Sequence, residues 1–114
     1  MKSETRRTML KQTFSERVVK IALEIPKGRV TTYGRIARAA GAGPMASQSI
    51  TSILGKAYQN GEKDIPFHRI VYADGRVWIN EKYEKKRLAL YKKEGIKLDK
   101  NNRILNFRDI LLEF

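Results

Sequence analysis

The stretch that decides the fold lies at residues 32–58 and reads TYGRIARAAGAGPMASQSITSILGKAY. Thr32 suits the N-cap of a helix over Tyr33–Ala40, because its hydroxyl can accept a hydrogen bond from a free N–H of the first turn. Gly41 ends that helix, and apolar residues at helical spacing predict a second helix over about Ala46–Tyr58. Two short helices joined by a glycine-containing turn are typical of a helix-turn-helix, although other αα-hairpins share the pattern.

One face of the second predicted helix is small, polar and uncharged, which is unusual in a chain this basic. Its members are Ser47, Gln48, Thr51, Ser52 and Gly55. The opposite face, with Ile50 and Leu54, is apolar and belongs in the core. Short side chains let a helix backbone approach a large flat partner, and hydroxyl and amide groups can hydrogen-bond base edges. We therefore predict that Ser47, Gln48, Thr51 and Ser52 contact DNA.

The charge balance also favours nucleic acid as a partner. The 114 residues include 24 lysines and arginines against 12 acidic residues, a formal net charge of +12. Such a chain is attracted to polyanions, although the charge could also serve solubility alone. The basic residues are scattered and do not form a stripe along one long amphipathic helix, which argues against a membrane surface.

The composition excludes several kinds of chemistry. The chain has no cysteine, and its one histidine is His68. Disulfides, thiolate catalysis and cysteine-based zinc sites are therefore excluded, and we expect no metal site and no cofactor. No apolar run approaches the roughly 20 residues that span a bilayer. Residues 1–12 are polar and basic, unlike a secretory signal, so we expect a flexible arm there and a cytoplasmic protein.

The elements around the helix pair predict a mostly α-helical domain with a small β-hairpin, similar to winged helix-turn-helix domains. Thr13 begins a capping box, so a first helix starts after it and must end by Pro26. The Asp-Gly pair at residues 74–75 separates two short runs, Ile-Val-Tyr at 70–72 and Arg-Val-Trp at 76–78, which are rich in β-branched and aromatic residues. This arrangement predicts a hairpin.

A last helix is predicted over about Glu81–Glu94, with Leu88 and Tyr91 facing inward and Tyr83 or Arg87 one turn before them. Residues 96–114 contain only short apolar pieces, which the pattern does not place. Because no linker or repeat interrupts the chain, we expect one domain over residues 13–114.

Three segments share their order and spacing with a known family. They read IPKGRVTTYG at residues 25–34, IPFHRI at 65–70 and KEG at 93–95. Together they closely resemble the C-terminal domain of O6-alkylguanine-DNA alkyltransferase, over about residues 14–96. The catalytic box of that family is Pro-Cys-His-Arg-Val, and Phe67 stands where its cysteine takes up the alkyl group. A phenyl ring has no lone pair to accept an alkyl cation, so the chain is similar to the alkyltransferase-like proteins, which bind the lesion without repairing it.

The resemblance implies roles for individual residues. Tyr33 matches the tyrosine that helps to rotate the target nucleotide out of the duplex. His68 and Glu94, with Arg69 beside them, are expected to hold the pocket loop in place. Gln48 stands where the family inserts an arginine into the base stack, and it lacks the charge and stacking plane of a guanidinium. The implied lesion pocket consists of Tyr33, Leu54, Phe67, Ile70, Val77, Trp78, Ile79 and Asn80.

The resemblance further implies a non-enzymatic monomer that binds O6-alkylguanine in double-stranded DNA and presents it to nucleotide excision repair. Base flipping is needed because the O6 edge is paired inside the duplex. Two alternatives stay open. One is a helix-turn-helix regulator without lesion specificity, in which Gln48 and Ser52 read bases. The other is an enzyme with a substitute nucleophile such as Tyr72 or Glu94, both of which are poor nucleophiles at neutral pH.

Overall fold

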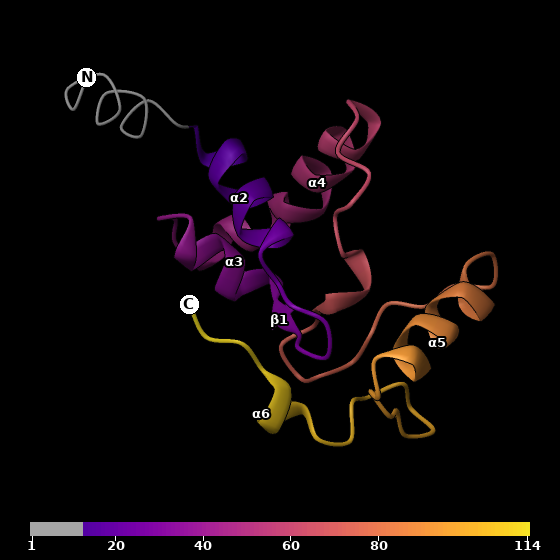
Figure 1. Cartoon of the computed structure of the whole chain (residues 1–114). Coiled ribbons are helices and arrows are strands. Elements are labelled where there is room, and N and C mark those ends of the chain that lie inside the picture. Colours follow the sequence, from indigo (N-terminus) through magenta and orange to yellow (C-terminus); the bar gives the residue numbers. More distant parts are fainter. Residues whose placement is uncertain (1–12) are drawn as a thin grey trace.

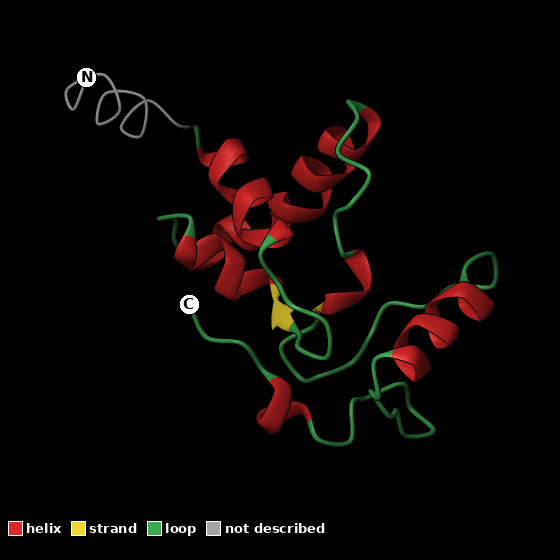
Figure 2. Ribbon diagram, viewed as in Figure 1, coloured by secondary structure: helices red, strands yellow, loops and turns green. Residues whose placement is uncertain are grey.

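The computed structural model describes residues 13–114 (Figure 1). The arm predicted at residues 1–12 lies outside this range. Helices dominate the described chain, and the only sheet found there is one short pair of strands (Figure 2). The prediction of a mostly α-helical fold is therefore confirmed. Between residues 13 and 114, every helix is too short or too polar to cross a membrane.

The first described helix, α2, spans Phe14–Leu23 and begins where the sequence predicts. The backbone N–H of Glu16 donates to the Thr13 hydroxyl oxygen at 3.1 Å. This bond satisfies one of the amides that the first turn of a helix leaves without a partner. On its apolar side α2 buries Val18 and Ala22 completely.

The helix-turn-helix consists of α3 (Tyr33–Ala39) and α4 (Ile50–Gln59), joined through the 3-10 helix η1 (Pro44–Ser49). Thr32 caps α3 as predicted, because its hydroxyl oxygen accepts a hydrogen bond from the N–H of Arg35 at 3.2 Å.

The second predicted helix is divided into two parts. Its first part is η1, whose tighter turns use i→i+3 hydrogen bonds, and only its second part is the α-helix α4. Ser47 and Gln48 therefore lie in η1, whereas Thr51 and Ser52 lie in the first turn of α4.

The three helices α2, α3 and α4 pack around a first hydrophobic cluster. Its fully buried members from these helices are Val18, Ala22, Ile36, Ala37, Ile50 and Leu54. Burying an aliphatic side chain of this size stabilises a fold by about 1.5–3 kcal/mol. The cluster therefore fixes α3 and α4 relative to each other.

The two strands form a parallel pair, so the predicted hairpin is wrong. β1 (Thr31–Thr32) pairs with β2 (Ile70–Val71). The turn at Asp74–Gly75 is present, but Arg76 after it forms an antiparallel bridge with Arg103 and not with β2. Both residues of β2 are buried, and strands covered on both faces are typical of parallel pairing, whereas a surface hairpin keeps one face in water.

The helix α5 spans Glu84–Lys93, inside the predicted range of Glu81–Glu94. Tyr91 is buried as predicted, with 1% exposure, whereas the prediction for Leu88 is wrong because it is 41% exposed. Arg87, one turn before Tyr91, occupies the inward side of the helix in place of Leu88.

A second hydrophobic cluster lies where α5, the strands and the C-terminal segment meet. Its buried members are Val30, Val71, Val77, Tyr91, Ile96 and Ile104. The C-terminal segment, residues 104–114, contains the short helix α6 (Phe107–Ile110). After α6, Leu111 forms a parallel bridge with Val30, and the N–H of Leu112 donates to the carbonyl of Val30 at 2.7 Å. The apolar pieces that the sequence pattern left unplaced therefore close the fold against β1.

Candidate nucleic-acid interface

A cavity of about 870 Å³ opens where the helix-turn-helix meets the rest of the chain. The start of α3, η1 and α4 form one side, and residues 67–78, α5 and the C-terminal segment form the other. The predicted pocket residues that line it are Tyr33, Leu54, Phe67, Ile70 and Trp78. Its volume lies within the range of about 300–1,000 Å³ that is common for small-molecule sites.

The predicted DNA-contacting residues lie at the helix-turn-helix side of this cavity. Ser47, Gln48 and Thr51 belong to its lining. Gln48 and Thr51 are exposed. Ser52 is also exposed, on α4 outside the lining. Polar side chains from η1 and α4 thus border the same cavity as Tyr33.

Three predicted pocket residues lie elsewhere, and their prediction needs correction. Val77 is buried in the second hydrophobic cluster, and Ile79 packs against that cluster. Asn80 is exposed, and its side-chain oxygen accepts a hydrogen bond from the N–H of Tyr83 at 3.0 Å. Neighbouring side chains of this segment point in different directions, so Trp78 lines the cavity while Val77 and Ile79 face the core.

Aromatic rings form much of the apolar lining. The ring centroids of Tyr33 and Tyr72 are 5.7 Å apart, in a tilted arrangement. Burial and the nearby Tyr72 raise the pKa of Tyr33, and they outweigh the opposing effects of Arg87 and the Thr51 side chain. The Tyr33 hydroxyl therefore keeps its proton at neutral pH and is available as a hydrogen-bond donor.

The charged groups of the lining are all cations. Arg35, Arg38 and Arg87 line the cavity, and none of its lining residues is Asp or Glu. Arg35 pairs with Glu113 at 3.1 Å, whereas Arg38 and Arg87 form no ion pair with a described carboxylate. The guanidinium of Arg87 lies over the ring of Trp78, 5.3 Å from its centroid. This composition attracts anionic groups.

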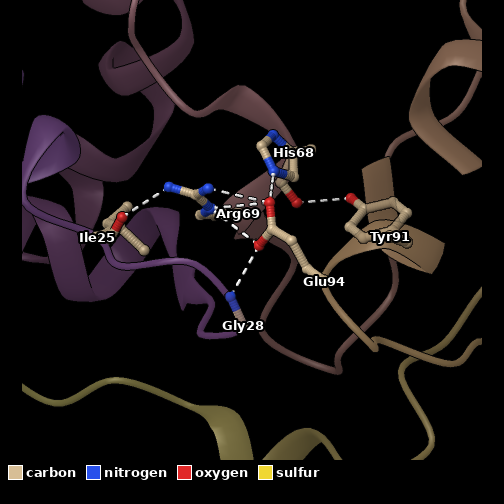
Figure 3. A network of polar contacts seen from close by, with 6 residues as sticks. All are labelled: Ile25, Gly28, His68, Arg69, Tyr91 and Glu94. Atoms are coloured by element: carbon tan, nitrogen blue, oxygen red, sulfur yellow. Dashed lines mark hydrogen bonds and ion pairs between the residues drawn. The ribbon is translucent and has the colours of Figure 1, made fainter. Parts of the chain in front are cut away.

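A buried polar network holds the loop that carries Phe67 (Figure 3). The carboxylate of Glu94 accepts hydrogen bonds from the Gly28 N–H at 2.8 Å and from Arg69 Nε and Nη2, both at 3.0 Å. His68 Nε2 lies 2.5 Å from the second oxygen of this carboxylate. The Tyr91 hydroxyl donates to the carbonyl of His68 at 2.6 Å. Three segments distant in the sequence are thus joined at Glu94.

The network changes the pKa of both of its titratable partners. Burial acts to raise the pKa of Glu94, but hydrogen bonds from Arg69, Gly28 and His68 outweigh burial and lower it to about 2. Burial lowers the pKa of His68, and the nearby Glu94 only partly opposes this effect. At neutral pH the network therefore contains an ionised carboxylate that Arg69 neutralises, and a neutral imidazole.

Sequence reasoning missed some cavity residues. Arg87 carried a usable signal, because it precedes the inward residue Tyr91 by one helical turn. Tyr72 directly follows β2, where a predicted hairpin had placed it on a regular strand. Phe107 and Leu111 had no local signal, because they reach the cavity only through the bridge between Leu111 and Val30, the residue before β1.

The chain is similar in sequence and in fold to known proteins. Residues 13–96 match the family described as 6-O-methylguanine DNA methyltransferase, DNA binding domain. The chain belongs to this family. The match contains the helix-turn-helix and the whole Glu94 network. Phe107 and Leu111 lie beyond the part of the chain that matches the methyltransferase DNA-binding domain.

Curated relatives cover a shorter stretch. The DNA base-flipping proteins of Escherichia coli (strain K12) and Shigella flexneri are each 38% identical over 65 residues, which are 57% of this chain and 48% of each relative. The chain thus spans about half the length of the curated relatives it matches.

Solved structures of similar shape include S. pombe Atl1 in complex with damaged DNA containing O6-carboxymethylguanine. It has a TM-score of 0.69 at 23% identity, over 89% of this chain and 95% of Atl1, which confirms the fold. A variant of Mycobacterium tuberculosis OGT has a TM-score of 0.54 at 29% identity, over 73% of this chain and 48% of that protein.

Proposed function

We propose that this protein recognises O6-alkylated guanine in double-stranded DNA. The damaged nucleotide rotates out of the duplex, and the cavity holds its base without removal of the alkyl group. The observation that carries the proposal is the cavity itself. It opens beside the polar residues of η1 and α4, has Tyr33 on that side, and contains Phe67 at the family position of the acceptor cysteine.

The relatives support the flipping step. The E. coli relative is named a DNA base-flipping protein, and Atl1 of the same fold has been solved on damaged DNA. Extrusion costs a few kcal/mol, and less for a base that pairs poorly, so flipping by itself favours the damaged nucleotide.

The side chains of the site support binding without alkyl transfer. The chain contains no cysteine, and the ring of Phe67 offers no nucleophile. Burial raises the pKa of Tyr33, so the hydroxyl of this cavity residue stays protonated at neutral pH and is a poor nucleophile as well. Both carboxylate oxygens of Glu94 already accept hydrogen bonds.

Recognition without repair requires a later step that removes the lesion. We propose that a monomer of this protein marks the alkylated guanine for nucleotide excision repair. Such a role fits a site that can hold the base but cannot accept its substituent.

The decisive experiment compares the affinities of two identical duplexes, one with guanine and one with O6-methylguanine, at one stated salt concentration. We expect tighter binding of the O6-methylguanine duplex. After long incubation, intact-mass spectrometry is expected to show an unmodified chain. A stoichiometric added methyl group would show that a substitute nucleophile operates, and equal affinities would favour a helix-turn-helix regulator.

Tyr33 provides a second prediction. Its hydroxyl is expected to hydrogen-bond the extruded nucleotide, so Tyr33→Phe should weaken lesion binding by about 0.5–1.5 kcal/mol. The affinity for undamaged duplex should change less. Fluorescence anisotropy on both duplexes measures the two affinities, and thermal melting checks the fold.

The matched control is Tyr58→Phe, which removes the same hydroxyl from an exposed tyrosine of α4 outside the cavity lining. It should leave both affinities unchanged. An equal loss on both duplexes after Tyr33→Phe, with a lower melting temperature, would assign Tyr33 a purely structural role.

A further inference from the structure

The C-terminal segment is held firmly against the helix-turn-helix half of the molecule. Arg29 donates from Nε to the carbonyl of Ile110 at 3.0 Å and from Nη2 to the carbonyl of Leu111 at 3.1 Å. Beside these bonds, Arg35 of α3 pairs with Glu113 at 3.1 Å. These bonds therefore fix the backbone at Ile110 and Leu111 relative to Arg29.

Two of its side chains, Phe107 and Leu111, line the cavity described above. The ring of Phe107 lies against the backbone of Gly75, where an added Cβ would come within 3.0 Å of it. Gly75 has a φ of +86°, which suits glycine and lets the chain turn under the ring. The close approach fixes Phe107 in place.

Phe107 and Leu111 also line a second cavity of about 640 Å³. The second cavity shares Arg35 and Ala73 with the first as well. The two apolar side chains thus belong to the linings of two cavities that share part of their walls. A smaller side chain at either position would enlarge the first cavity, and a larger one would narrow it.

We propose that Phe107 and Leu111 form a specificity-determining wall that sets the size of O6 substituent the protein accepts. This inference rests on the proposed function, because it concerns the base held in the same cavity. The physical reason is steric: an apolar wall discriminates by the methylene groups it can accommodate, and each methylene group changes affinity by about tenfold or more. The wall lies outside residues 13–96, which carry the family match.

The test uses the full chain and three duplexes that contain guanine, O6-methylguanine or O6-benzylguanine at one position. The readout is the ratio of the benzyl to the methyl affinity. Leu111→Ala opens the wall, so the ratio should rise by about tenfold. Leu111→Phe narrows the cavity, so the ratio should fall. Both changes keep the backbone atoms that hold the segment.

The matched control is Leu105→Ala, because Leu105 lies in the same segment, is 64% exposed and lines neither cavity. Its ratio should equal that of the unaltered protein. Phe107→Leu gives a second variant at the wall and is a smaller change than truncation to alanine. The melting temperature of every variant is measured to confirm that it folds.

The outcomes separate the two proposals. Opposite shifts for the two Leu111 variants support the wall. If the unaltered protein prefers O6-methylguanine over guanine but all folded variants share one ratio, the wall inference is overturned and the proposed function stands. If the unaltered protein binds guanine and O6-methylguanine equally, the proposed function is overturned and the wall inference with it.

Discussion

Replacing Glu94 with glutamine is expected to lower the free energy of unfolding by about 3 kcal/mol, the cost of breaking a buried ion pair. The amide keeps the size of the side chain but removes its charge. The guanidinium of Arg69, whose side chain is 14% exposed, would then be buried without a carboxylate. Unfolding in urea, followed by Trp78 fluorescence or circular dichroism, measures the loss.

The matched control is Glu62→Gln, which removes the same charge from an exposed glutamate that forms no ion pair with a described residue. It should change stability by less than about 0.5 kcal/mol. Equal effects of the two substitutions would mean that the Glu94 network contributes nothing to folding.

The same network predicts how stability depends on pH. The pKa of Glu94 falls from its ordinary 4.5 to about 2, so its stabilising effect is complete above pH 4.5 and is lost as the pH falls toward 2. The pKa of His68 is also below its ordinary 6.5, and acidification below that value favours the unfolded chain as well. The Glu94→Gln variant should lack the lower part of this acid transition.

The second prediction with a large expected effect concerns how the affinity for DNA depends on salt concentration. If the protein contacts roughly 4–6 phosphates, the logarithm of its DNA affinity should fall with the logarithm of salt concentration with a slope of about −4 to −5. A tenfold rise in salt would then reduce affinity by about four to five orders of magnitude. Affinity that does not change with salt would contradict a phosphate-contacting surface.

Two charge variants locate that surface. Arg38 lines the cavity on the helix-turn-helix side and has no described carboxylate partner, so Arg38→Gln should reduce the slope by about 1. Arg103→Gln removes the same charge from a side chain that pairs with Asp74 at 3.3 Å, outside the cavity lining. It should leave the slope unchanged.

Features that depend on neighbouring residues could be predicted from the sequence. The caps at Thr13 and Thr32 are examples, because a hydroxyl and an amide three residues apart meet wherever a helix begins. The helix-turn-helix follows from the same local rules. The hairpin prediction was wrong because the strand partner of Ile70–Val71 is β1, almost forty positions earlier in the chain. The local sequence around Asp74–Gly75 does not distinguish this distant pairing from a β-hairpin.

The candidate site likewise contains residues that sequence motifs could predict and residues that they could not. Motif spacing led to Tyr33, Phe67 and the residues of the Glu94 network, and the structure brings the network residues together (Figure 3). Whether they act on DNA as proposed stays a prediction. Motif spacing could not show which way Val77 or Ile79 points. It also could not bring the C-terminal segment to the cavity, since that depends on a backbone bridge across the whole domain.

The domain is closed by contacts between its N-terminal half and its C-terminal segment, and this has a consequence for its biosynthesis. The contact between Arg29 and Ile110 spans 81 positions, whereas the helices α2, α3 and α4, which contact one another, all lie within residues 14–59. Local contacts form before such distant ones, and chains begin to fold while they are being made. We therefore expect that, on the ribosome, α2, α3 and α4 can pack together before the C-terminal residues that line the cavity have been added. For that interval the nascent chain has the charge to bind DNA but lacks the closed site that would tell one base from another.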